Sequence, residues 1–95
     1  MYKEDIIELI KELDLPYQVY KHELLEGEEY EAIYVYGKRS YMLRTKYPRR
    51  YKNLYQPYLR ISHYYEGRLY VRDNGYCEFV NPVWLKERLM KMVKE

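Results

Sequence analysis

The sequence has few of the residues that staple small proteins together. Its single cysteine, Cys77, excludes an internal disulfide. The two histidines, His22 and His63, lie far apart and form no Cys/His cluster, so we predict no metal site. No segment approaches the ~20 consecutive apolar residues of a membrane span. We therefore expect one domain over residues 1–95, held together by packing, with no membrane contact.

Catalytic motifs are also missing. The chain has no Gly-rich phosphate loop and no Cys-x-x-Cys, and Ser40 and Ser62 lack the glycine context of a nucleophilic serine. A small ribonuclease works by general acid–base catalysis and charge stabilisation. The local candidate residues for that chemistry are His63, Arg60, Tyr64 and Glu66. Strand alternation puts His63 on the aliphatic face of the strand predicted at 58–65, which favours a structural role in the core over a catalytic one. We predict no enzyme activity and no cofactor.

Two further shortages bear on the cell compartment and the host in which the protein works. The stretch Met1–Asp5 is not the start of a secretory leader, and one free thiol fits a reducing compartment. We therefore expect an intracellular, cytoplasmic protein. Only two glutamines and three asparagines accompany 34% charged residues, a pattern reported for proteins of hot environments. This composition suggests an archaeon, or one of its viruses, as the host.

The few glycines and prolines divide the chain into segments. All four glycines lie between extended-looking runs, at positions 27, 37, 67 and 75. Residues 73–75, Asp-Asn-Gly, are the strongest hairpin signal, because Asn-Gly tolerates the positive φ of a type I′ turn. Pro16 is expected to close a first helix. Asn81 followed by Pro82 is typical of a helix start.

Hydrophobic periodicity predicts a helix near each end of the chain. Ile6, Ile10 and Leu13 form part of an apolar stripe over 3–13, and Leu85, Leu89 and Met92 form one over 82–94. Six strands are predicted between them, at 17–25, 29–36, 39–46, 58–65, 68–72 and 76–80. These elements predict an α+β fold: an antiparallel sheet of five to six strands in two meanders, flanked by an N-terminal and a C-terminal helix packed on one face.

Alternation along the strands predicts two unlike faces of the sheet. Ile33 and Val35, and then Leu59 and Ile61, occupy every second position. Cys77 and Phe79 are expected inward with them in the last strand. This aliphatic face should receive the helices. The opposite face should present tyrosine and arginine, at Tyr34, Tyr36, Tyr58, Arg60, Tyr64, Tyr70, Arg72 and Tyr76.

Charge is distributed unevenly along the chain. Residues 1–31 hold ten acids and three bases, and residues 66–95 hold five acids and six bases. Residues 32–65 hold eight bases, nine tyrosines and no acid at all. Arginine and lysine neutralise phosphates, and tyrosine rings stack on bases. The pattern therefore predicts a module that binds DNA or RNA with little sequence specificity, through Lys38, Arg39, Arg44, Lys46, Arg49, Arg50, Tyr51, Lys52, Tyr55, Tyr58, Arg60, Tyr64, Tyr70 and Arg72.

Other interpretations of the same features stay open at this point. The acidic first third of the chain would neutralise the basic middle if the two lie together, within one chain or across a dimer. Tyrosines also cover sheets for stability and are enriched in protein interfaces. The alternative function is accordingly a protein–protein interaction module: a homodimeric accessory or inhibitor protein, viral or plasmid-encoded, with the tyrosine face buried in the interface.

Overall fold

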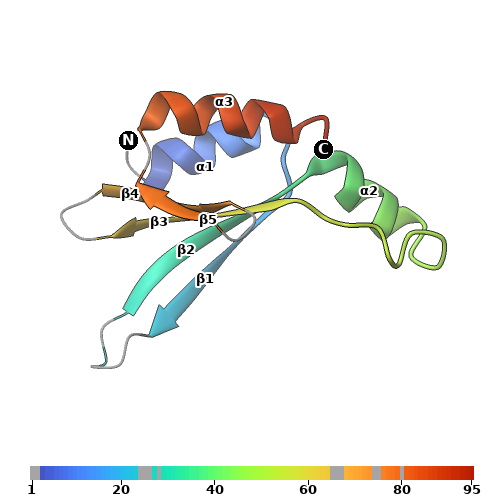
Figure 1. Ribbon diagram of the computed structural model, residues 1–95, viewed down its shortest axis with the longest axis horizontal. Coiled ribbons are helices and arrows are strands. Elements are labelled where there is room, and N and C mark those ends of the chain that lie inside the picture. Colours follow the sequence, from blue (N-terminus) through green and yellow to red (C-terminus); the bar gives the residue numbers. More distant parts are fainter. Residues whose placement is uncertain (1–2, 24–26, 28, 65–67, 74–75, 80) are drawn as a thin grey trace.

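In the computed structural model, two helices lie side by side over one face of an antiparallel sheet, and a third helix extends beyond one end of the sheet (Figure 1). The structure describes residues 3–23, 27, 29–64, 68–73, 76–79 and 81–95, and between residues 63 and 80 it describes side chains only at Val71. The elements in these residues are α1 (Lys3–Glu12), β1 (Tyr17–Glu23), β2 (Glu29–Tyr36), α2 (Lys38–Lys46), β3 (Tyr58–Tyr64), β4 (Arg68–Asp73), β5 (Tyr76–Phe79) and α3 (Pro82–Met92).

The described strands form one meander, in the order β1-β2-β3-β4-β5, and every neighbouring pair is antiparallel. The prediction of two separate meanders is therefore wrong, and a third helix, α2, accompanies the two predicted terminal helices. β2 pairs directly with β3, with Tyr36 opposite Tyr58, so the intervening residues leave the sheet and return to it at the same level.

The predicted strand at 39–46 is also wrong, because this segment is helix α2. Its Lys, Arg, Met and Leu residues are good helix formers. Ser40 is the one buried residue of α2, so the helix has no apolar stripe that a periodicity analysis would detect. Gly37, expected between two extended runs, has φ of −57° and ψ of 127° and is instead the cap residue before the helix.

The core lies between the aliphatic face of the sheet and helices α1 and α3. Ile6 and Ile10 of α1 and Leu85 and Leu89 of α3 are fully buried. From the sheet they meet a set of side chains that are all at most 3% exposed: Ile33, Val35, Leu59, Ile61 and Val71. The predicted aliphatic face of β2, β3 and β4 is thus confirmed. Burying one such side chain stabilises the fold by roughly 1.5–3 kcal/mol.

The register of β5 differs from the alternation expected for it. Glu78 pairs with Val71, and Cys77 pairs with Arg72. We expected position 77 to align with the aliphatic positions of the neighbouring strand, and position 76 to lie on the opposite face. This prediction is wrong, because position 78 is the one that aligns with Val71. The sequence shows alternation within a strand, but it does not show which parity aligns with the neighbouring strand.

Helix α3 begins as the sequence predicts. The side chain of Asn81 accepts a hydrogen bond of 2.8 Å from the Trp84 N–H, and Pro82 occupies the first helical position, where a missing N–H costs nothing. Among the helices in the described ranges, none is long and apolar enough to cross a membrane.

Replacing Leu59 with alanine tests the core. The side chain is fully buried against both helices, so the cavity should lower the free energy of unfolding by about 2–5 kcal/mol. Urea titration followed by circular dichroism measures the loss. Val83→Ala is the matched control, because Val83 is 67% exposed, and it should change stability by less than about 0.5 kcal/mol. Equal losses in the two variants would show that the core lies elsewhere.

Candidate functional site

Three contacts hold helix α2 against the rest of the molecule. The Lys38 ammonium lies 3.3 Å from the Asp14 carboxylate, just after α1. The Ser40 N–H donates a hydrogen bond of 2.9 Å to the backbone oxygen of Glu95. The Tyr41 ring stacks on Tyr36 at the end of β2, with 5.9 Å between centroids. The helix is therefore attached at its first turn, while its C-terminal turn points away from the sheet (Figure 1).

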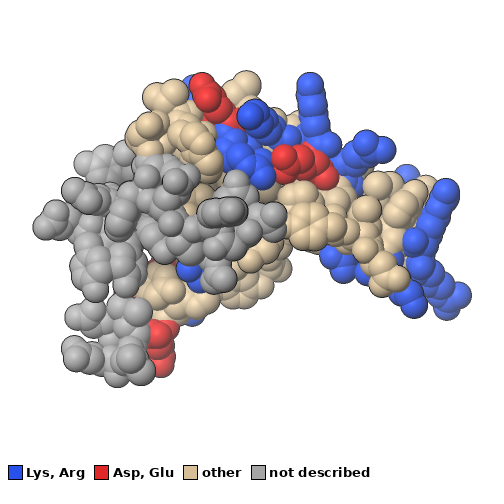
Figure 2. Space-filling view, in the orientation of Figure 1, with Lys and Arg blue, Asp and Glu red and all other residues tan. Residues whose placement is uncertain are grey.

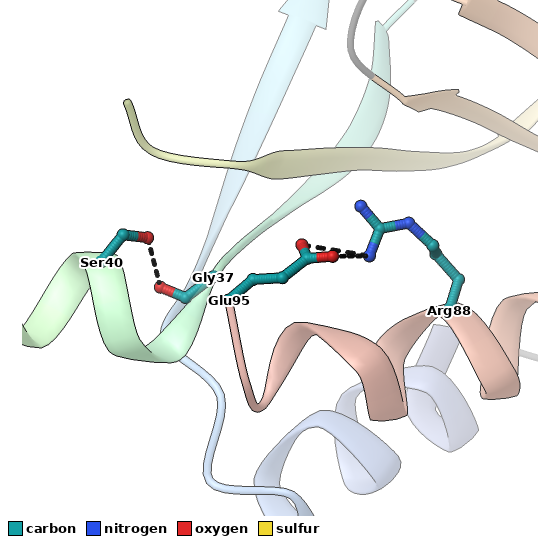
Figure 3. A network of polar contacts seen from close by, with 4 residues as sticks. All are labelled: Gly37, Ser40, Arg88 and Glu95. Atoms are coloured by element: carbon teal, nitrogen blue, oxygen red, sulfur yellow. Dashed lines mark hydrogen bonds and ion pairs between the residues drawn. The ribbon is translucent and has the colours of Figure 1, made fainter. Parts of the chain in front are cut away.

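The contact with Glu95 depends on the absence of a side chain at residue 37. A Cβ atom at Gly37 would lie 2.9 Å from the carbonyl carbon of Glu95, closer than real Cβ contacts allow. The Glu95 carboxylate itself turns toward Arg88 on α3, at 3.1 and 3.2 Å (Figure 3). The end of the described chain is thus fixed on both sides, and it satisfies one of the free N–H groups of the α2 N-terminus.

The residues after α2 fold back in a series of turns. The Tyr51 N–H donates to the oxygen of Tyr47 at 3.1 Å, and the Leu54 N–H donates to that of Tyr51 at 3.0 Å. The Gly37 N–H then donates to Pro57 at 2.9 Å, which closes the segment at its base. We call residues 38–57 the basic arm.

Cations cover the basic arm (Figure 2). Six of them are solvent-exposed, at Arg39, Arg44, Lys46, Arg49, Arg50 and Lys52. Lys38 pairs with Asp14, but none of these six forms an ion pair with a carboxylate in the part of the chain that the structure describes. Since the arm contains no acid, its charges repel one another and favour an anion from outside the arm.

Tyrosine rings lie among these cations. The Lys46 ammonium sits 5.6 Å from the centroid of the Tyr47 ring, and the Arg50 guanidinium sits 5.4 Å from that of Tyr51. The Tyr47 and Tyr51 rings are 6.3 Å apart. Tyr55 is 60% exposed. The predicted residues Tyr51 and Tyr55 are thus brought together with the predicted cations of the arm.

The sheet surface opposite the helices carries a second group of rings, which we call the tyrosine face: Tyr20, His22, Tyr30, Tyr34, Tyr36 and Tyr58. Tyr34 stacks on Tyr58 at 6.4 Å and meets Tyr20 edge-on at 5.2 Å. Gln18 accepts hydrogen bonds from Tyr20 and Tyr36, at 2.5 and 3.0 Å. Burial, and then the neighbouring phenols, raise the pKa of the Tyr36 hydroxyl above its ordinary value.

Arg60 lies on the same face, half-buried, and its buried Nε atom has no hydrogen-bond partner among the described residues. By register it stands between Tyr34 on β2 and Arg72 on β4. The predicted site residues Tyr64, Tyr70 and Arg72 have side chains outside the described residues. The predicted tyrosine and arginine face is therefore established at Tyr34, Tyr36, Tyr58 and Arg60.

The acidic first third does not neutralise the arm in the described residues. The Glu31 carboxylate instead pairs with Lys3 of α1, whose hydrogen bond and charge lower the pKa of Glu31. Asp14 is the carboxylate that reaches the arm, at Lys38. The exposed acids Glu23 and Glu29 stand at the free end of the β1–β2 pair, at the opposite end of the molecule from the arm.

Two further predictions concern catalysis and metal binding. His63, Tyr64 and Glu66 of the ribonuclease-like set lie outside the described side chains. No group of three or more His, Cys, Asp or Glu that would hold a metal ion occurs in the described residues. Sequence reasoning missed Tyr41 and Tyr47 of the arm, although both belong to the acid-free stretch and so carried its signal.

No protein-family model, no curated protein and no solved structure matches this chain.

Gly37→Ala tests how α2 is attached. The added Cβ forces the backbone at Glu95 to move and breaks its hydrogen bond with Ser40, so the free energy of unfolding should fall by about 0.5–1.5 kcal/mol. Thermal and urea unfolding measure the change. Lys94→Ala serves as control, because that side chain is exposed beside the same contact. A Gly37→Ala protein as stable as the wild type would mean that Glu95 does not hold the helix.

Proposed function

We propose that this protein binds nucleic acid through the basic arm, which contacts the phosphate backbone. One observation carries the proposal: six exposed cations lie together on residues 38–57, and none of them has a carboxylate partner among the described residues. Neutralised phosphates release their counterions, and this release supplies most of the sequence-independent affinity for nucleic acid. The arm projects from one end of the molecule, beyond the sheet and helices α1 and α3, where a nucleic-acid strand has access to it (Figure 1).

Low sequence specificity is part of the proposal. Base-specific contacts in a duplex need side chains, Arg and Lys among them, that a docked element holds in register with the base edges, mainly in the major groove. The arm instead presents long, exposed Arg and Lys side chains on a short helix and a series of turns. Such side chains suit phosphates, which repeat regularly along any strand and carry no sequence information.

The tyrosine face extends the proposed surface. Tyr41 of the arm stacks on Tyr36 of the sheet, so the two aromatic surfaces are continuous. The rings of this face are oriented by hydrogen bonds, including 3.2 Å between the Tyr34 hydroxyl and Nε2 of His22. Ordered neutral rings lose little conformational entropy when a base stacks on them, which favours binding. A cytoplasmic location and a host from a hot environment stay predictions.

Removing three arm cations together tests the proposal. The variant Arg49→Ala/Arg50→Ala/Lys52→Ala loses three candidate phosphate contacts, so its affinity for short DNA and RNA should fall. The slope of log K against log salt concentration should become shallower by about 2 for single strands. Fluorescence anisotropy between ~50 and ~200 mM salt, the range over which phosphate contacts weaken steeply, measures both quantities.

The matched control removes the same charge elsewhere. Lys11→Ala/Lys21→Ala/Lys86→Ala changes exposed residues on α1, β1 and α3, outside the arm. Its salt slope should stay close to that of the wild type. If both triple variants weaken binding equally, affinity follows net charge and not the arm. If the wild type binds no strand at low salt, the proposed function is wrong.

A second candidate function rests on the edge of the sheet. β1 is an edge strand in the described sheet, and it carries two exposed large side chains, Val19 at 39% and Tyr20 at 45%. Exposed edge strands pair with other chains unless they are protected. Two copies joined along β1 would make a homodimer with a continuous tyrosine face.

Light scattering at micromolar concentration tests this dimer. A mass twice that of the 12.0 kDa chain is expected, and Val19→Lys should return the protein to monomers because edge charges block strand pairing. A wild-type monomer under these conditions would exclude the β1 dimer, and it would leave binding by the basic arm unaffected.

A further inference from the structure

A cavity of about 400 Å³ opens between α2, the turns of the basic arm and the end of the described chain. Leu43 of α2, Leu54 and Pro57 supply apolar lining, and Tyr51 and Tyr55 supply aromatic lining. This volume lies within the range of ~300–1,000 Å³ that is usual for pockets of small ligands. The cavity is separate from the tyrosine face, because its lining residues come from the arm and from the segment after α3.

The chemistry of the lining favours a planar aromatic group. The two tyrosine rings offer flat surfaces of the kind on which bases stack, whatever the identity of the base, and three apolar side chains add van der Waals contacts beside them. Ser40, which also lines the cavity, already donates its hydroxyl hydrogen to the Gly37 oxygen at 3.3 Å. The lining thus makes stacking and apolar contacts more readily than it makes specific hydrogen bonds.

The rim of the cavity carries uncompensated positive charge. Arg39 and Lys94 line it, and both are exposed. The acid beside them, Glu95, has its carboxylate engaged by Arg88, with both oxygens within 3.2 Å of one guanidinium nitrogen (Figure 3). Two cations therefore border an aromatic pocket whose own carboxylate is already neutralised, and an anionic group on the ligand would complete the pairing.

We propose that this cavity receives one unpaired base of a single-stranded nucleic acid, with the phosphate of the same nucleotide at Arg39 and Lys94. The inference rests on the proposed function and deepens it: the other cations of the arm hold the backbone of the strand, and the cavity selects single strands over duplexes. A duplex keeps its bases stacked and paired, so it has no base to insert unless the base is flipped out.

The test compares two strands that have the same phosphates. One is a short single-stranded oligonucleotide, and the other is the same strand made entirely of abasic sites. Fluorescence anisotropy at constant low salt gives the ratio of their dissociation constants. The wild type should bind the base-bearing strand about 5- to 100-fold more tightly, the range expected for stacking of one base. The double variant Tyr51→Leu/Tyr55→Leu should lower this ratio at least about 5-fold and leave the affinity for the abasic strand unchanged. The part of the ratio that remains is stacking on the tyrosine face.

A ring-retaining variant is the matched control. Tyr51→Phe/Tyr55→Phe removes two hydroxyls and keeps both aromatic surfaces, so it should retain the wild-type ratio. Circular dichroism checks that each variant is folded. If the double leucine variant unfolds, the single variant Tyr55→Leu replaces it, because a side chain that is 60% exposed contributes little to packing. The single variant should lower the ratio part of the way toward one.

Two outcomes would overturn the inference and leave the proposed function standing. The first is salt-sensitive wild-type binding with equal affinities for the base-bearing and abasic strands. The second is a folded leucine variant that keeps the wild-type ratio, which would assign base stacking to the tyrosine face. Failure of the wild type to bind either strand at low salt would overturn the proposed function and the inference together.

Discussion

The pairing of β2 with β3 is the constraint on which the rest of the molecule depends. It places Val35 beside Leu59 and Ile33 beside Ile61 at the centre of the core, where α1 and α3 cover them. The same pairing brings Tyr36 opposite Tyr58, so that the chain leaves the sheet and returns to it at one place. The hydrogen bonds between these two strands thus position the hydrophobic core on one face of the sheet and the tyrosine face on the other. At their end they also hold the two ends of the arm together.

The residues that stabilise the fold and the residues proposed to bind nucleic acid lie in different parts of this structure. The fully buried side chains belong to α1, α3 and the sheet, whereas α2 buries Ser40 and exposes Tyr41 and Met42. The arm is held by backbone hydrogen bonds, one ion pair and ring stacking rather than by a core of its own. Its six exposed cations, which pair with no carboxylate among the described residues, repel one another, and a bound polyanion would relieve this repulsion.

The parts of the fold that could be predicted from the sequence are those with one apolar side. β2 and β3 carry aliphatic residues at alternate positions, and α1 and α3 carry apolar stripes, so burial alone determines their orientation. α2 could not be predicted in this way, because a helix without a buried apolar side leaves no period to detect. The parity of β5 was missed for a related reason, since alternation within a strand carries no information about register. For the site, the acid-free stretch identified the arm cations, but the approach of Glu95 to Gly37 joins residues far apart in the sequence and has no local signal.

The closure of the arm at its base affects how its sequence can change during evolution. Because its two ends meet at the β2–β3 ladder, the arm is an insertion into a hairpin, and the entropy cost of such a loop rises only slowly with length. Lengthening, shortening or recharging it would disturb the contacts at Asp14, Tyr36 and Glu95, while the helices and the sheet would keep their packing. The core does not depend on the arm, so proteins with the same core could carry arms of different length and charge. Such proteins need share neither a ligand nor a surface charge.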